Sequence, residues 1–171
     1  RVYVEDVIRM RDDPRLTECD VARADALCDY LVEIHRVQGD NPELYVRRIR
    51  DLIGHSECIM GLIDSYPARH DIADRALLQE IERQCVDWRW RLKDRVHRLR
   101  QVHGDFHPWN ILFREGPDFT LLDRSRGEWG DPADDITCLT MNYLFFSLQR
   151  SGRLDGNLES LFRRFWNRYL T

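Results

Sequence analysis

The sequence predicts an α+β domain that is mostly helical and carries one small β insert. Apolar residues recur every three or four positions over several long segments, which is typical of amphipathic helices. Two short runs of strand-forming residues flank a Gly-Pro turn, which indicates a β-hairpin. The 171 residues are the size of one domain and are enough to bury a core, so we expect a single lobe over 1–171.

The first expected element is a short strand over 2–7, because this stretch alternates and contains β-branched residues. A helix is then expected over 17–37. Thr17 is a suitable N-cap, and Asp20 stands three residues later, as in a capping box. Leu27, Leu31 and Ile34 fall on one face of this helix.

The remaining helices are predicted from caps and from apolar periodicity. Asn41 is placed to cap a helix whose first turn holds Pro42 and which a glycine closes. The longest helix has one continuous apolar stripe, and we interpret its arginine-rich opposite face as solvated because acids are interleaved with the arginines. The expected ranges are 41–54, 56–65, 71–98, 134–149 and 158–170.

The β insert consists of a short extended piece at 101–103 and a hairpin. The hairpin strands are expected over 111–114 and 119–123, joined by a four-residue turn, "EGPD". With that turn length Asn110 stands opposite Asp123 at the open end of the hairpin.

Three oxygen-bearing side chains are therefore expected at the mouth of this hairpin. Asn110 and Asp123 at cross-strand spacing can share a hard cation such as Mg²⁺. Asp105 stands in a loop bent by Pro108 and can fold back over the same point. This combination points to phosphoryl transfer, which needs positioning and charge neutralisation more than covalent chemistry from the protein.

Three motifs resemble a known family. The catalytic-loop stretch "HGDFHPWN" (103–110), the stretch "LLDRSRGEWGDPADDI" (121–136) and the helical "LVEIH" (31–35) are similar to segments of the aminoglycoside phosphotransferase family. The resemblance covers essentially the whole chain. It implies the C-terminal lobe of a protein-kinase-like fold, and an ATP-dependent or GTP-dependent kinase acting on the hydroxyl group of a small molecule.

The resemblance also implies roles for individual residues. Asp105 resembles the catalytic base, and Asn110 and Asp123 resemble the Mg²⁺ ligands that hold the nucleotide phosphates. The stretch 1–8 resembles the hinge, where the backbone around Glu5 would hydrogen-bond to the adenine. The supporting residues are His103, His35 and Asp135.

An N-terminal nucleotide lobe is expected to be absent from this chain. No glycine-rich loop precedes residue 104, and the only lysine, Lys93, lies in a helix after the hinge-like stretch. The chain begins at Arg1 and not at a methionine. We therefore expect the 171 residues alone to bind ATP poorly and to be close to inactive.

Four further side chains are candidates for the substrate side of the site. His107 is one, and Trp109 suits either a core or a pocket. Glu128 and Asp131 suit either the attraction of a cationic acceptor or the capping of loops. Family members act on aminoglycosides, choline-like alcohols, homoserine and sugars, and the sequence leaves the choice among these open.

Two other functions compete with the kinase. One is a non-catalytic remnant of the same fold that serves as a binding module, which the missing nucleotide lobe favours and the retention of all three chemical groups opposes. The other is a metal-dependent hydrolase in which His103, Asp105 and His107 form an alternating ligand cluster. Pro108 and the lack of a further histidine or cysteine cluster speak against the hydrolase.

The composition argues against nucleic-acid binding and against a membrane location. The net charge of −4 argues against general nucleic-acid binding, and no run of 18 apolar residues predicts a membrane span. The five cysteines are scattered and never form a CxxC pair, which favours a reducing cytoplasm. No signal peptide is visible in the highly charged first residues.

Overall fold

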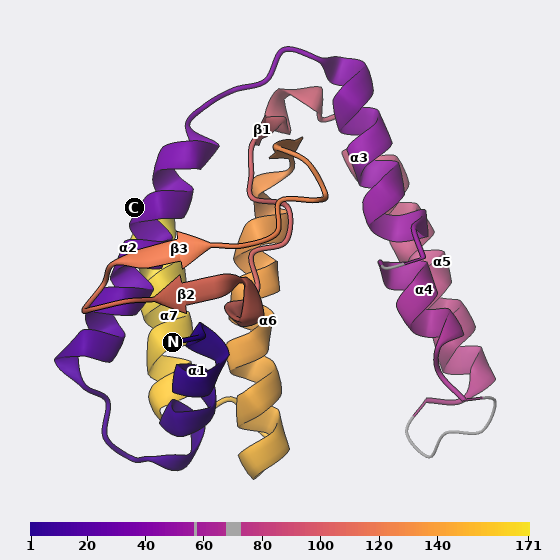
Figure 1. Ribbon diagram of the computed structural model, residues 1–171. Coiled ribbons are helices and arrows are strands. Elements are labelled where there is room, and N and C mark those ends of the chain that lie inside the picture. Colours follow the sequence, from indigo (N-terminus) through magenta and orange to yellow (C-terminus); the bar gives the residue numbers. More distant parts are fainter. Residues whose placement is uncertain (57, 68–72) are drawn as a thin grey trace. The chain divides into compact units, whose positions relative to one another are not determined.

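The computed structural model describes residues 1–56, 58–67 and 73–171 (Figure 1). They form two compact units, one made of residues 1–37 and 100–171 and the other of residues 38–99. Helices dominate and the strands are only two or three residues long, so the predicted mostly helical α+β class is confirmed. The predicted single lobe over 1–171 stays a prediction.

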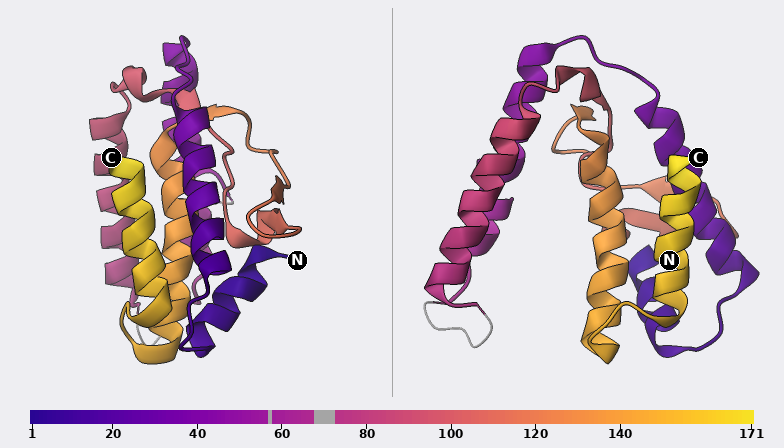
Figure 2. Two further views of the ribbon diagram at one scale, coloured as in Figure 1. Left: turned by 90° about the vertical axis from the view of Figure 1, so that its left-hand side faces the viewer. Right: turned by 180° about the vertical axis from the view of Figure 1, so that it is seen from behind.

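The first unit packs four helices beside a small hairpin (Figures 1 and 2). Its helices are α1 (Tyr3–Asp12), α2 (Glu18–His35), α6 (Pro132–Ser151) and α7 (Gly156–Leu170). Its strands are β1 (Arg100–Gln101), β2 (Ile111–Phe113), β3 (Phe119–Leu121) and β4 (Trp129–Gly130), and a 3-10 turn, η2 (Pro108–Asn110), precedes β2. The antiparallel pairs are β1 with β4 and β2 with β3.

The predicted helix starts follow from side-chain caps. The Thr17 hydroxyl accepts the Asp20 N–H, and the Asp20 carboxylate accepts the Thr17 N–H, so the capping box of α2 is confirmed. The Asp131 carboxylate accepts the Ala133 N–H at 3.0 Å and caps α6. Asp131 thus caps a helix, and its role toward an acceptor stays a prediction.

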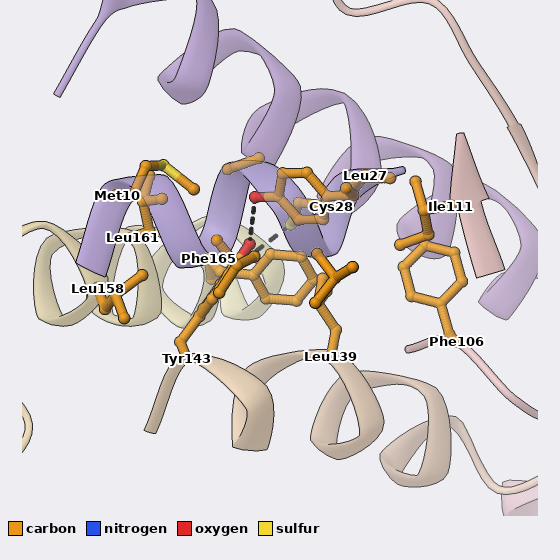
Figure 3. Close-up of a cluster of buried hydrophobic side chains, with 14 of the residues drawn as sticks. Met10, Leu27, Cys28, Phe106, Ile111, Leu139, Tyr143, Leu158, Leu161 and Phe165 are labelled. Atoms are coloured by element: carbon orange, nitrogen blue, oxygen red, sulfur yellow. Dashed lines mark hydrogen bonds between the residues drawn. The ribbon is translucent and has the colours of Figure 1, made fainter. Parts of the chain in front are cut away.

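The core of the first unit lies between α1, α2, α6 and α7 and extends to β2 (Figure 3). Leu139 and Tyr143 of α6 point toward Phe165 of α7 and Cys28 of α2. The hydroxyls of Tyr143 and Tyr3 lie 2.7 Å apart in this interior. Because both hydroxyls have a partner, two buried polar atoms are accommodated without a desolvation penalty.

The strand predicted over 2–7 is wrong, and with it the hinge-like strand over 1–8, because the chain forms helix α1 there. The side chains that α1 buries recur at helical spacing, at Tyr3, Val4, Val7 and Met10. Only the first two residues are extended: Val2 forms an isolated antiparallel bridge with Leu112 of β2. Two valines in alternation were too short a pattern to outweigh the helical stripe that follows.

The hairpin is confirmed, but its predicted register is off by one. Ile111 pairs with Leu121 and not with Leu122. The Leu122 N–H donates to the Asn110 carbonyl at 2.8 Å, so Leu122, and not Asp123, stands opposite Asn110.

The length of the turn explains the shift in register. The Arg114 N–H donates to the Asp118 carbonyl at 3.0 Å, so the hairpin closes over the three residues 115–117 instead of four. Gly116 accommodates the short turn with a φ of +52°. Because the turn has one residue fewer than predicted, every cross-strand partner is shifted by one position.

The second unit, residues 38–99, is a separate helical cluster. It contains α3 (Pro42–Gly54), α4 (Ile59–Asp64), α5 (Arg75–Leu92) and a 3-10 turn, η1 (Val96–Arg98). Asn41 caps α3 by accepting the Leu44 N–H at 2.9 Å, as predicted. The helix predicted over 71–98 is shorter, because Asp74 caps α5 and the turn η1 replaces its last part; the predicted start at Asp71 lies outside the described residues.

In the described part of the chain, no helix is both long enough and apolar enough to cross a membrane.

Candidate active site

A buried carboxylate holds the loop that connects β1 to η2. Asp135, in the first turn of α6, is fully buried and accepts the N–H groups of His103 and Gly104 at 2.7 and 2.8 Å. His35 of α2 contacts the same carboxylate through Nε2 at 3.1 Å. Its Nδ1 lies 2.8 Å from the Tyr169 hydroxyl of α7. Charge-assisted hydrogen bonds thus tie the loop to α6, and His35 connects the same carboxylate to α2 and, through Tyr169, to α7.

His103 supports the loop from inside the core. Its ring is fully buried and lies edge-on to Phe106, with ring centroids 5.7 Å apart. Its Nδ1 accepts the Asp105 N–H at 3.3 Å, which requires an unprotonated Nδ1. Burial lowers the pKa of His103, more than the nearby Asp135 raises it, and so favours the neutral ring that this hydrogen bond needs.

Glycine is required next to His103. Gly104 has a φ of +87°, and a Cβ atom at this position would lie 3.0 Å from the carbonyl oxygen of Gly127. The loop that bears Asp105 therefore runs directly against the segment that follows Asp123.

Asp105 sits at the tip of this loop with its carboxylate 12% exposed. The Asn110 amide donates to Asp105 Oδ2 at 3.1 Å, and His107 Nε2 lies 3.3 Å from the same oxygen. Arg126 Nη1 approaches the other oxygen, Oδ1, at 3.4 Å. The carboxylate is held by three neighbours and is still reachable from solvent, which is the arrangement that a positioned proton acceptor needs.

Asn110 and Asp123 offer oxygen atoms of the kind that Mg²⁺ prefers. The two Nδ2 hydrogen bonds of Asn110 both go to Asp105, which leaves its Oδ1 without a donor among the described residues. Asp123 is exposed and has a φ of +51°. The hydroxyl and the amide of Ser125 lower the pKa of Asp123, so its carboxylate stays ionised at neutral pH. One amide oxygen and one carboxylate fit a hard cation in kind.

His107 and Trp109 lie beside the base. His107 caps η2 by accepting the Trp109 N–H at 3.2 Å, and the two rings meet edge-on with centroids 5.7 Å apart. Trp109 is 48% exposed and is not a core residue.

The hydrolase cluster is not supported. No group of three or more histidines, cysteines or acids in residues 1–56, 58–67 and 73–171 is arranged to hold a metal ion. His103 is buried against Phe106, whereas His107 bonds to Asp105 at the surface, so the sequence alternation does not bring the two rings to one point.

The comparison with known proteins decides the family. A model of the phosphotransferase enzyme family matches residues 9–168 of the chain. The chain belongs to the phosphotransferase enzyme family. The resemblance to aminoglycoside phosphotransferases is thereby confirmed, and the general activity is phosphoryl transfer. No curated protein and no solved structure matches the chain.

Two of the predicted site residues, Glu128 and Glu5, have no interaction with Asp105, Asn110 or Asp123 in the part of the chain that the structure describes. Glu128 is exposed, and its backbone carbonyl accepts the Val102 N–H at 2.9 Å. Glu5 is exposed on α1, and its N–H donates to the Val2 carbonyl at 3.1 Å. The extended backbone on which the assignment of Glu5 to the nucleotide rested is absent, so Glu5 is not part of the proposed site.

Three residues of the candidate site were not predicted from the sequence. Arg126 contacts Asp105, Tyr169 contacts His35, and Asp134 lies close enough to Asp105 for the charge of one carboxylate to affect the other. Arg126 stands only three residues after Asp123, and this closeness in sequence could have suggested that its side chain reaches Asp105. No sequence pattern indicates Tyr169, because its contact with His35 depends on how α7 packs.

Asp134 is a largely buried acid in the candidate site. Burial and the charges of Asp135 and Asp105 raise the pKa of Asp134 to about 7, although Arg126 opposes the rise. Its carboxylate makes no hydrogen bond or ion pair with the described residues.

Asp134→Asn should therefore stabilise the protein at pH 8 and not at pH 4. In the wild type the unfolded chain releases the Asp134 proton near pH 4, whereas the folded chain keeps it until about pH 7. Stability is lost over this interval, and the variant should gain about 1–3 kcal/mol above it. Urea unfolding at both pH values measures the gain, with exposed Asp118→Asn as the control. A gain of equal size at both pH values would contradict this account.

Proposed function

We propose that this phosphotransferase moves the γ-phosphoryl group of ATP or GTP to the hydroxyl group of a small molecule. The observation that carries the proposal is the Asp105 carboxylate, held between His107, Asn110 and Arg126 at 3.1–3.4 Å and open to solvent. A carboxylate in this position accepts the proton of an acceptor hydroxyl as its oxygen attacks phosphorus.

The three neighbours of Asp105 orient its carboxylate. Asn110 and His107 both bind Oδ2, which fixes the plane of the carboxylate. Arg126 contacts Oδ1 through one nitrogen, and its 38% exposed side chain has further donors that can bind a phosphoryl oxygen.

Asn110 and Asp123 are the residues that would hold Mg²⁺ on the nucleotide. The donor set supports this, since Asn110 Oδ1 faces no donor among the described residues and Asp123 stays ionised. When bound, the cation neutralises charge on the phosphates. Asp135 keeps the loop that carries Asp105 and Asn110 in one conformation.

We further propose that residues 1–171 supply the C-terminal-lobe side of a kinase-like site. The described residues contain only two-stranded sheets, and the single lysine, Lys93, caps the end of α5 in the second unit. The strand lysine and the loop that cover nucleotide phosphates in kinases therefore have no counterpart in the part of the chain that the structure describes.

The 171-residue chain alone should bind Mg·ATP only in about the millimolar range, because its described residues offer neither a strand lysine nor a loop to cover the phosphates. Isothermal titration calorimetry of this chain measures the affinity. A micromolar dissociation constant would show that the nucleotide site is complete within these residues.

The acceptor side of the site supports a donor-rich acceptor. Asp134 presents a carboxyl group without a partner close to Asp105, and an amine or hydroxyl on the acceptor can fill that position. Asp131 is used as the cap of α6, and Glu128 remains an exposed acid beside β4. A cationic acceptor is thus proposed on the basis of Asp134 more than of Glu128.

The experiment that tests the function is transfer of labelled phosphate from ATP to a panel of small hydroxyl compounds by the full-length protein. We expect labelled product with Mg²⁺ and none when EDTA removes the cation. Labelled product that forms equally well in EDTA, or no labelled product from any acceptor, would overturn the proposal.

A further inference from the structure

The outer face of α6 carries an apolar stripe. Met141, Phe145 and Leu148 are 52%, 51% and 44% exposed. They follow one another at spacings of four and three residues, so they lie on one side of the helix. The residues that α6 buries, such as Leu139 and Tyr143, lie on its opposite side. The exposed apolar side chains of α6 are therefore aligned and not scattered.

This stripe is continuous with the candidate active site. Cys138 and Asp134 precede Met141 on the same side of α6 at spacings of three and four residues. Asp135, the residue after Asp134, accepts the N–H groups of His103 and Gly104, so the start of the stripe lies beside the loop that bears Asp105.

Trp109 joins the stripe from the loop side. Its ring is 48% exposed and lies 6.1 Å from the ring of Phe146, which faces the buried side of α6 and lies 5.4 Å from the ring of Phe145 on the stripe. On its other side it meets His107, which contacts Asp105. A series of neighbouring aromatic rings therefore connects His107, beside Asp105, to Phe145 on the stripe.

The dimensions of this surface suit a ligand. Cys138 and Phe145 are seven residues apart, which is about 10 Å along a helix axis. Aligned exposed apolar side chains next to a few placed polar groups are typical of a binding surface. A wholly polar acceptor would leave these side chains in water.

We propose that the acceptor is an alcohol with an apolar body of about this length. Its hydroxyl lies at Asp105, and its apolar body lies along Met141, Phe145 and Trp109. This inference rests on the proposed phosphotransferase function and adds the chemical class of the acceptor.

The three methionines provide the probe for this surface. Met141 lies on the stripe, Met10 is buried in the core, and Met60 lies on α4 in the second unit. With methyl-labelled methionine, each gives one NMR signal that a Met→Leu variant assigns. Titration with phenylbutanol should shift the Met141 signal and leave Met10 in place. Triethylene glycol, of similar length but polar, should shift none.

A pair of variants tests the contact. Phe145→Ser should weaken phenylbutanol binding about tenfold, because an aromatic ring no longer leaves water. Leu170→Ser, which changes a 74% exposed residue of α7, should have no effect. An unshifted Met10 signal verifies that both variants are folded.

Three results would overturn the inference. One is a Met141 NMR signal that does not shift with phenylbutanol or that shifts equally with triethylene glycol. Another is unchanged affinity in Phe145→Ser. The third is a wild-type molecular mass of two chains that falls to the mass of one chain in Phe145→Ser. The stripe would then be an interface between copies of the chain.

The inference and the proposed function fail in different ways. If the full-length protein phosphorylates polar alcohols and not phenylbutanol, the acceptor class is wrong and the function stands. If it phosphorylates no alcohol while Met141 still reports binding, the proposed function is wrong.

Discussion

Replacing Asp105 by asparagine should lower the rate of phosphoryl transfer by about 10²–10⁴-fold, which is the usual contribution of a positioned general base. The amide has nearly the shape of the carboxylate but does not accept the acceptor proton. Its contacts with Asn110 and Arg126 can largely persist, so the loop should keep its conformation. Initial rates of transfer by the full-length protein measure the loss.

Nucleotide binding separates a catalytic loss from a structural one. In Asp105→Asn the affinity for Mg·ATP should stay within about twofold, because Asn110 and Asp123 are intact. Glu115→Gln, on the exposed hairpin turn, removes a carboxylate of the same kind outside the site and should change neither quantity. Near-normal turnover of Asp105→Asn would rule out Asp105 as the base.

Replacing Asp135 by alanine should destabilise the first unit by about 3–5 kcal/mol, because the change leaves buried partners of a charged group unpaired. The N–H groups of His103 and Gly104 and the His35 ring would all lose their acceptor. Urea denaturation of the chain measures the change in unfolding free energy.

A matched pair of variants distinguishes the hydrogen bonds from general effects of charge removal. Asp135→Asn keeps one accepting oxygen and should lose less stability than Asp135→Ala. Asp118→Ala, whose side chain is exposed at 66%, should stay within about 0.5 kcal/mol of the wild type. If Asp135→Ala resembled Asp118→Ala, the loop would have to be held by other contacts.

The elements that local sequence patterns govern were predicted well. The capping box at Thr17 and the cap at Asn41 depend on side chains three residues away, and both were recognised correctly. The loop that carries Asp105 and Asn110 could be singled out because its polar residues are close together in sequence. The strand over 2–7 failed because two alternating valines resemble a strand until the buried positions of the following turns are known.

The parts of the site that depend on register and tertiary packing were harder to predict. Because the hairpin turn is one residue shorter than predicted, the residue opposite Asn110 is Leu122 and not Asp123. Asp123 reaches its position through a left-handed backbone conformation that no periodic pattern reveals. The contacts of Arg126 with Asp105 and of Tyr169 with His35 join residues 21 and 134 positions apart, and only the fold brings them together.

The contact between Gly104 and Gly127 affects how the protein can evolve. Both glycines have φ near +90°, and a methyl group on Gly104 would already meet the Gly127 carbonyl at 3.0 Å. The loop that bears Asp105 and the segment that follows Asp123 are therefore sterically coupled. A side chain added at Gly104 would force the backbone at Gly127 to move, so a change in one of these segments is expected to require an adjustment of the other.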